Sequence, residues 1–517
     1  MKGNVLFITI FNLIVIFSGC SKHEHSELTS VRLQIPKETL LTIEENVDVA
    51  LDQRVISKNL KTYFDARLII NDSVIPIKIR LKGDWTDHVR TCKRSYRIKM
   101  PKGLYFNGMS VFSIQNPETK GFIDEWFLRK VFEMEGILTP RFEFVNVAIN
   151  GENIGVHAIE EHFQEELLKR SGKSPGPILK IDEEGFWETK IFERENGEEI
   201  QEYYPFYEAS VIRPFNEKKI LKSPKLYKQF LEAQSMLASI KNGNTPIDKI
   251  IKLDELAKLY AICDMARVNH GFAALNQRWY YDSESLLLEP IAHDFNGESR
   301  QTDKTPVIYG FRDTNLVTMT EPKYTIPFLP MNSSKFNELY YKYLNMYCNR
   351  KYLDKVFDSI DTELSQIEKI IQEEHYFYEF DKSHYYENLP RIHKQLALFK
   401  NPTSRIGPLF LFKFPILNQN ENNITLFPSI SINAYYNHPD STLFLQNFHN
   451  YPVTIDAITN KSKEKIRAQN IKLASYNHPG YDATIKLKSP PISVVFHVDG
   501  EKSNYTVKVI PWPQPNK

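Results

Sequence analysis

Residues 66–100 alternate between apolar and polar side chains with a period of two. The stretch contains the runs ARLIIND, SVIPIKIRLKG and RSYRIKM, with a turn signal at Asn71, Asp72 and Ser73 between the first two. Such alternation is typical of strands that bury one face. We therefore predict an antiparallel meander of strands in this region.

The period changes to that of a helix in residues 121–136, where Gly136 marks the expected end. Two alternating runs then flank Asn150 and Gly151, which is a strong signal for a hairpin. A second helix is predicted to leave this hairpin over residues 160–170.

The rest of the chain divides into a helical middle and a strand-rich end. Residues 217–270 and 335–400 have helical periodicity, and two short strands are expected at residues 279–281 and 286–291. From residue 412 onward the period returns to two, in LFLQNF, TIDAIT, DATIKLK and SVVFHV. We therefore predict an α+β fold with a C-terminal, sandwich-like all-β domain.

Composition limits the classes of function. The 517 residues include 65 Lys and Arg against 64 Asp and Glu, a formal net charge of +1, so no bulk charge favours nucleic-acid binding. A chain of this length is expected to form two or three domains, because single cores stop growing near ~250–300 residues. The cysteines are too few and too widely spaced for a CxxC metal clip or a disulfide framework: Cys20, Cys92, Cys263 and Cys348.

The N-terminus has the pattern of a signal peptide. Lys2 precedes an apolar run over residues 5–17 that is too short to span a bilayer as a helix. The run ends in FSGC, which resembles a bacterial lipoprotein processing site, although Leu is usual where Phe17 stands. Cys20 is then expected to carry lipid and to anchor the protein in a membrane, facing the periplasm or the cell exterior. The other interpretation is an exported protein with a free cysteine.

Basic residues on the first strands are placed to approach a phosphate. RLKGDW carries Arg80 and Lys82 beside a glycine turn, and KRSYRIK carries Lys93 and Lys99. Glu125, on the next helix, could pair with one of these lysines. Phosphoryl transfer needs a cation on the phosphates and a carboxylate that fixes this cation.

Acidic and amide residues follow much later in the chain. Asp264 and Asn276 precede Asp294, which stands in HDFNG at the end of a predicted strand and could hold Mg²⁺ through oxygen. Strands, helix, hairpin, helices and late acids on short strands follow the order of the parts of a protein kinase.

The chain resembles the spore-coat protein H (CotH) kinase family, atypical kinases of bacteria and some eukaryotes. Several ordered segments carry the resemblance, over residues 66–296: RLKGDW with KRSYRIKM, EWFLRKVFEMEG with TPR, INGENIGVHAIEEH, GPILK, and NQRWYY with EPIAHD. The resemblance implies a kinase-like fold that binds ATP and a divalent metal, Mg²⁺ or Mn²⁺. It also implies transfer of phosphate to protein hydroxyls.

The resemblance implies roles for single residues as well. Lys99 is the first choice for the nucleotide lysine, because it closes a strand reading YRIK, and Lys93 is the second. Glu125 matches the acidic position on the family's helix. Asp294 matches the metal-binding aspartate, and Asn276 matches the amide that precedes the aromatic strand.

The catalytic loop departs from the family pattern. Active members carry an aspartate a few residues before the position of Asn276, where this chain reads VNHGF without a carboxylate. One candidate base is Asp264, which precedes Asn269 by the interval of the kinase HRDxxxxN loop. The other is His270, because imidazole transfers protons near neutral pH. We favour Asp264.

The expected organisation is a lipoprotein signal peptide (1–20), a tether (21–45), a CotH kinase-like domain (46–405) and a β-sandwich-like domain (412–517). The expected partners are ATP, a protein hydroxyl substrate and, through the lipid, a membrane, with no nucleic acid. The enzyme is expected to be an atypical protein kinase.

Two other hypotheses remain open. A non-catalytic surface lipoprotein that kept the scaffold for binding is favoured by the missing carboxylate near His270. A metal hydrolase built on His270, His293 and Asp294 lacks the HExxH spacing that places two imidazoles on one helix face.

Overall fold

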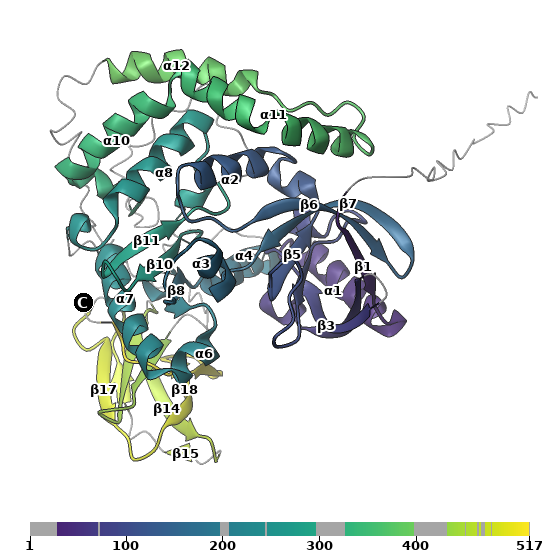
Figure 1. Ribbon diagram of the computed structural model, residues 1–517. Helices are drawn as coiled ribbons and strands as arrows, with labels where there is room; N and C mark the ends of the chain where they lie inside the picture. Colours follow the sequence, from purple (N-terminus) through teal and green to yellow (C-terminus); the bar gives the residue numbers. More distant parts are fainter. Residues whose placement is uncertain are drawn as a thin grey trace, which may run out of the picture.

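The computed structural model describes residues 28–515 apart from several gaps (Figure 1). The gaps are residues 71–72, 197–205, 243–245, 274, 296–325, 398–431, 450, 463–464, 467–470 and 477. The expected signal peptide, Cys20 and the expected domain boundary between residues 405 and 412 lie outside the described residues.

The N-terminal part is a closed barrel with the strand order β1-β2-β3-β4-β5-β7-β6. Its strands are β1 (Ser30–Gln34), β2 (Phe64–Ile70), β3 (Ser73–Leu81), β4 (Tyr96–Lys99), β5 (Val111–Gln115), β6 (Phe142–Ile149) and β7 (Glu152–Glu161). The pairing of β2, β3 and β4 confirms the predicted antiparallel meander. The barrel encloses an apolar core that helix α1 (Lys37–Gln53) joins through Ile43 and Val47.

Ordered structure begins earlier than the sequence indicated. Strand β1 and the first half of α1 lie within residues 21–45, where the sequence predicts a tether. The physical reason is that β1 closes the barrel, because it pairs with β2 on one side and runs parallel to β6 on the other.

The predicted hairpin is present as β6 and β7, but the helix after it starts later than expected. Glu160 and Glu161 still pair with β5, at Ser113 and Phe112. Their backbone groups are therefore used in the sheet, and α3 runs only from Glu165 to Arg170.

The middle of the chain combines helices with a second sheet, whose strand order is β11-β10-β8-β9. Its strands are β8 (Ile178–Ile181), β9 (Ile212–Pro214), β10 (Arg278–Asp282) and β11 (Leu287–Ile291). The helices are α2 (Asp124–Met134), α4 (Glu184–Asn196), α5 (Phe206–Ala209), α6 (Glu217–Lys222), α7 (Pro224–Asn242), α8 (Leu253–Ala266), α10 (Ser334–Tyr347), α11 (Arg350–Gln372) and α12 (Ser383–Leu396).

Helices α2, α8, α10, α11 and α12 form layers on one side of the second sheet. Figure 1 shows α10, α11 and α12 as an outer layer over α8 and α2. Helix α11 buries one apolar stripe, which includes Leu353, Phe357, Leu364 and Ile371. None of the helices in the described ranges is long and apolar enough to cross a membrane.

The C-terminal part is all-β, as predicted. One sheet has the order β12-β13-β17, the other β15-β14-β18-β19, and β16 pairs with β14. The strands are β12 (Ile432–Asn437), β13 (Thr442–Asn447), β14 (Val453–Asn460), β15 (Lys465–Ile466), β16 (Ile471–Leu473), β17 (Asp482–Lys486), β18 (Pro491–Val498) and β19 (Asn504–Lys508). Side chains of both sheets, such as Leu445 and Phe496, share a buried core. This part is not separate from the helices, because Trp512 belongs to their core and packs 5.2 Å from the ring of Phe230 on α7.

Candidate active site

A buried ion cluster joins the barrel to helix α2. Glu160, near the end of β7, is 3% exposed. Its carboxylate lies 3.0 Å from the Arg129 guanidinium of α2 and 3.5 Å from the ammonium of Lys82, which follows β3. Arg129 also contacts Glu125 at 2.7 Å, one helical turn earlier. Charges this deeply buried are tolerated only when they are paired, so the four side chains hold one another in place.

The charges of this cluster differ in how fully their surroundings compensate them. Burial alone would raise the pKa of Glu160, but Lys82, His293 and Arg129 lower this pKa well below its usual range. Burial lowers the pKa of Lys82 to about 8, and the attraction of Glu160 offsets only part of that effect. Lys82 therefore lacks full compensation for its charge, and an added anion would stabilise its protonated form.

Asp294 follows β11 and forms an ion pair with Lys120, the last residue of the short helix η3 (Pro117–Lys120). Burial would raise the pKa of Asp294, but Lys120 and His293 hold this pKa well below its usual range. The backbone of Asp294 is left-handed, with φ at 57°. Such conformations cost free energy for a residue with a side chain and are concentrated at functional sites.

Two imidazoles flank Asp294 in different surroundings. The side chain of His293 is 14% exposed, and its Nδ1 lies 3.4 Å from the Glu160 carboxylate and 3.2 Å from the Arg129 guanidinium. His270 belongs to the short helix η5 (His270–Phe272), is 46% exposed, and places Nε2 3.8 Å from the Asp294 carboxylate. His270 is thus the imidazole that a bound substrate could reach.

Gly271 permits the approach of His270 to Asp294. A Cβ atom at position 271 would lie 2.7 Å from the carbonyl oxygen of His293 and 2.8 Å from the ring of Phe295. Only glycine therefore fits where η5 meets the end of β11.

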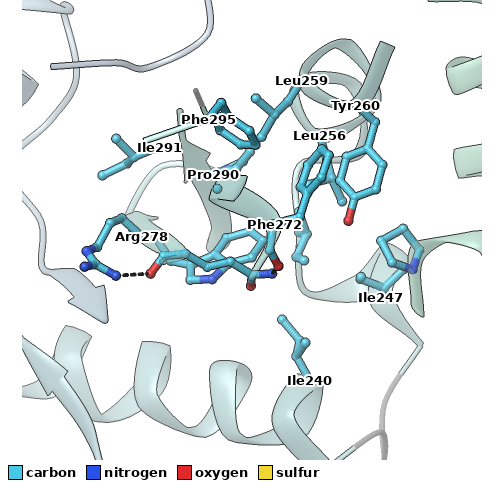
Figure 2. Close-up of a pocket in the computed structure, with 15 residues that line it drawn as sticks. Ile240, Ile247, Leu256, Leu259, Tyr260, Phe272, Arg278, Pro290, Ile291 and Phe295 are labelled. Atoms are coloured by element: carbon cyan, nitrogen blue, oxygen red, sulfur yellow. Dashed lines mark hydrogen bonds between the residues drawn. The ribbon is translucent and has the colours of Figure 1, made fainter. Parts of the chain in front are cut away.

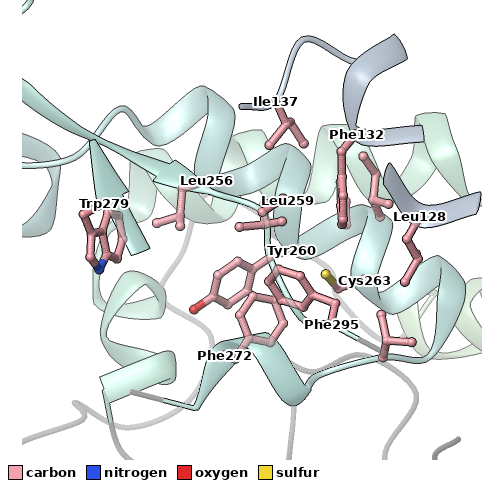
Figure 3. Close-up of a cluster of buried hydrophobic side chains, with 14 of the residues drawn as sticks. Leu128, Phe132, Ile137, Leu256, Leu259, Tyr260, Cys263, Phe272, Trp279 and Phe295 are labelled. Atoms are coloured by element: carbon pink, nitrogen blue, oxygen red, sulfur yellow. The ribbon is translucent and has the colours of Figure 1, made fainter. Parts of the chain in front are cut away.

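Aromatic rings pack beside the residues that follow His270 and Asp294 in the chain, and Figure 3 shows this cluster. The ring of Phe295 lies 5.0 Å from Phe272 and 5.8 Å from Phe132 of α2, and Phe272 lies 4.1 Å from Tyr260 of α8. The backbone that carries Asp294 and His270 is therefore fixed by packing on two helices.

A mainly apolar pocket lies behind the same turn (Figure 2). Its lining includes Gly271, Phe272 and Phe295 together with Leu256 and Leu259 of α8. Such a lining offers few atoms to a phosphate or a metal ion, so we assign it to the support of the turn.

The structure places the lysines nominated from sequence at different sites. Lys99 is exposed at the end of β4, opposite Lys78 of β3. Lys93 forms an ion pair with Glu374 and donates a 3.0 Å hydrogen bond to the carbonyl of Val156. Of the nominated lysines, Lys82 is the one in the ion cluster.

Arg80 is half-buried and lies outside the ion cluster. Its guanidinium sits 5.3 Å from the ring centroid of Tyr63 and donates a 2.7 Å hydrogen bond to the carbonyl of Leu81. Its charge acts on its neighbour Arg97: burial and then Arg80 lower the pKa of Arg97 to about 10.

The nominated acids and amide also differ in position. Glu125 is in the cluster, but its close partner is Arg129 and not a lysine of the strands. Asp264 is 3% exposed on α8, and its carboxylate accepts a hydrogen bond from Tyr340 of α10. That contact directs Asp264 toward the helical layer. Asn276 donates a 3.1 Å hydrogen bond to the carbonyl of His270, next to Asp294.

Three functional candidates were missed from sequence. Glu160 is a charged residue at a buried position of a strand, and Arg129 lies on the buried stripe of α2, four residues after Glu125. Both residues could have been recognised in the sequence, because each places a charge at a position where the pattern predicts a buried apolar side chain. Lys120 lies in a turn after β5, where no periodicity points to a role.

Two hydrogen-bond donors near Lys82, on Gln115 and Arg97, are buried without an acceptor among the described residues. Gln115 accepts a hydrogen bond from Lys82, yet its amide nitrogen is buried without a partner in the described part of the chain. The Nε of Arg97 is likewise buried without a partner among the described residues. Buried donors without acceptors are costly, so this part of the site favours an anionic ligand.

Asp294 and Asn276 are the residues that could hold a divalent metal. Within residues 28–515, gaps excepted, no group of three or more His, Cys, Asp and Glu side chains is arranged to hold a metal ion. Mg²⁺ is usually bound by one or two carboxylates together with substrate phosphates, so these donors fit a metal that arrives with a nucleotide. The metal-hydrolase hypothesis loses support, because His293 faces Glu160 and Arg129.

The comparison with known families agrees with the resemblance seen in the sequence. A family model described as CotH kinase protein matches residues 79–397, which include the end of β3, the barrel strands from β4 onward, the ion cluster and Asp294. No curated protein matches the chain. The chain therefore belongs to the CotH kinase protein family.

Proposed function

We propose that this protein is an atypical kinase with a kinase-like fold that uses ATP and Mg²⁺ or Mn²⁺ to transfer phosphate to protein hydroxyls. The observation that carries the proposal is the convergence of Lys82, Lys120 and Asp294, from three distant segments, at the junction of the barrel and the helices. A phosphoryl-transfer site needs cations for the phosphates beside a carboxylate for the metal.

In this proposal the barrel supplies the cations. Lys82 and Arg97 bind phosphate oxygens, and Glu160 fixes Lys82 as the acidic partner that Glu125 was expected to be. The Glu125 carboxylate does not contact Lys82 in this proposal; it positions Arg129, which in turn holds Glu160.

Asp294 and Asn276 are the proposed metal ligands. A divalent cation bound there would neutralise charge on the transferred phosphoryl group. Lys120 balances the Asp294 carboxylate before a metal is bound, and it can then turn to a phosphate.

His270 is the proposed general base. It lies beside Asp294 and is accessible to a substrate hydroxyl, whereas Asp264 is buried against Tyr340. Neutral imidazole can accept the hydroxyl proton when the oxygen attacks phosphorus.

The proposal includes attachment to a membrane through lipid on Cys20. Support comes from the FSGC sequence after the apolar run. A Cys20→Ser variant is expected to leave the membrane fraction, because its acyl chains would be lost. Unchanged partitioning of this variant would contradict the anchor.

The test of the kinase proposal is Mg·ATP binding and transfer of labelled phosphate by the purified protein. We expect Mg·ATP to raise the melting temperature of the unchanged protein, and Asp294→Asn to abolish the metal-dependent part of this rise. Asp65→Asn is the matched control, since Asp65 is 83% exposed on β2 and away from the cluster. Equal rises in all three proteins would remove Asp294 from the site.

A second candidate is a catalytically inactive member that binds nucleotide or protein at the cell surface. The Lys120–Asp294 ion pair favours it, because a lysine already neutralises the acid that would hold metal. This candidate predicts Mg·ATP binding without any transfer of label.

A further inference from the structure

The loop between α11 and α12 exposes two neighbouring aromatic rings, which we call the aromatic tip (Tyr376 and Phe377). Tyr376 is 80% exposed and Phe377 is 95% exposed, more than any other large apolar side chain of the described residues. Their ring centroids are 5.1 Å apart, nearly perpendicular. Two large apolar rings held in water on one loop indicate an interaction surface.

The base of this loop is held firmly by the rest of the molecule. Glu374 accepts a 2.8 Å hydrogen bond from the backbone nitrogen of Val156 and forms an ion pair with Lys93. On the other side of the tip, the ring of Tyr378 packs 4.8 Å from Phe122. The aromatic tip is therefore presented by a fixed frame on both sides.

The tip lies close to the point where residue 28 begins the described structure. The carbonyl of Thr29 accepts a 3.1 Å hydrogen bond from Asn146 of β6, and Asn146 pairs with Val156 of β7, which bonds Glu374. Neighbouring strands are about 4.8 Å apart, so Thr29 lies roughly 10 Å from Val156, to which the side chain of Glu374 at the base of the loop is hydrogen-bonded. Figure 1 shows the end of α11 next to β6 and β7.

We propose that the aromatic tip inserts into the surface of the lipid bilayer to which the protein is anchored. This inference rests on the proposed lipid on Cys20. From Cys20 to Leu28 the chain can span at most about 29 Å, so a lipid on Cys20 keeps the loop near the bilayer. Phe and Tyr are suited to this position, because the apolar rings enter the interface while the Tyr hydroxyl remains hydrated.

The charges around the tip select the kind of lipid. Glu373 and Glu379 are exposed on either side of the two rings, whereas Glu374 is paired with Lys93 and Lys382 contacts Asp361. Glu373 and Glu379 form no ion pair with the residues that the structure describes, so anionic headgroups would repel them. A zwitterionic surface is therefore the expected partner.

Insertion would fix how the active site faces the membrane. Phe122, which packs on Tyr378, follows Lys120 by two residues, and Lys120 holds Asp294. The tip and the site are thus connected through one short segment, and the site would be held at a constant height above the bilayer.

The test uses the chain from Cys20 onward, which contains every described residue, with Cys92→Ser so that Cys20 is the accessible thiol. Cys263 and Cys348 are buried. The thiol is coupled to maleimide lipid in vesicles of phosphatidylcholine or of phosphatidylglycerol, each containing brominated lipid. Phe377→Trp reports insertion by bromine quenching, measured as the increment over the protein without this substitution. Tyr105→Trp is the matched control, since Tyr105 is 52% exposed on the β4–β5 loop.

We expect quenching for Phe377→Trp in phosphatidylcholine, less in phosphatidylglycerol, and none for Tyr105→Trp. In a second measurement on the uncoupled Cys20→Ser protein, Tyr376→Ser with Phe377→Ser should lower the vesicle partition coefficient about tenfold to a hundredfold. Equal quenching of both tryptophan variants, or no quenching of either in coupled protein, would overturn the proposal. Coupling through the thiol keeps this result independent of whether the cell acylates Cys20, which fractionation tests separately.

Discussion

The two sides of the candidate site differ in how firmly they are held. On the barrel side, Arg129 contacts the carboxylates of Glu125 and Glu160, and all three are nearly inaccessible to water. On the opposite side, His270 is 46% exposed and lies 3.8 Å from Asp294. The first side is part of the core of the protein, and the second is a surface turn.

This difference predicts that the two sides tolerate substitution unequally. A buried ion pair that loses one partner leaves an uncompensated charge, so the barrel side cannot vary without loss of stability. An exposed side chain contributes little to the fold, so the residue at position 270 can vary with little loss of stability.

The largest expected effect is that of Arg129→Met. It leaves Glu125 and Glu160 buried without their cation, and we expect a loss of about 3–5 kcal/mol in the free energy of unfolding. Chemical denaturation measures this change. Lys78→Met is the control, since the ion pair of Lys78 with Asp65 is exposed and its loss should cost at most about 0.5 kcal/mol. Similar losses in both variants would mean that the two sides do not differ as described.

The next effect is on catalysis at the exposed side. His270→Ala should reduce phosphoryl transfer at least about a hundredfold with little change in melting temperature, because a general base contributes to rate and not to the core. Asp264→Asn should lower the melting temperature instead, since it disturbs the buried contact with Tyr340. If Asp264→Asn abolishes transfer in a fully stable protein, the base is Asp264.

A smaller effect, on ATP affinity, distinguishes the two lysines that are candidates for binding the nucleotide. Lys82→Met should weaken ATP binding by roughly tenfold to a hundredfold, because a charged hydrogen bond to phosphate is lost. Lys99→Met should leave the dissociation constant unchanged, as Lys99 is exposed at the end of β4. Isothermal titration of both variants with Mg·ATP checks this, and the opposite order would restore Lys99 as the nucleotide lysine.

The pH dependence of ATP binding is the smallest and most specific effect. Burial lowers the pKa of Lys82 from 10.5 to about 8, so its charge is lost in the folded protein as the pH rises through about 8. ATP affinity should fall above that pH, whereas Lys82→Arg should keep its affinity, because guanidinium stays protonated.

The stability of the fold should change with pH in the opposite direction to ATP affinity. Below about pH 8 the folded protein carries the full cost of the buried charge of Lys82, and this cost is relieved between about pH 8 and 10.5. The Lys82 contribution to stability therefore rises with pH in this window, and Lys82→Met should remove that slope. An unchanged slope in Lys82→Met would assign the titration to another group.

Local patterns in the sequence were sufficient for most elements and for the position of Asp294. The meander, the hairpin and the helices follow from periods of two and 3.6 residues, which neighbouring residues determine. Closure of the barrel was not predictable in this way, because it depends on the pairing of Ser30 with Asn146. The same limit applies to the site: Lys120 and Asp294 are 174 residues apart, and no local spacing brings them together.

The position of Trp512 determines when the helical core can be completed during folding. Its ring fills part of the core beneath α7, against Phe230, and Arg213 lies 5.8 Å from its centroid. Residue 512 leaves the ribosome long after the helices that it covers. The helical core therefore stays incomplete until residue 512 has been synthesised, and a chain that stops before Trp512 would expose an apolar surface that chaperones and proteases recognise.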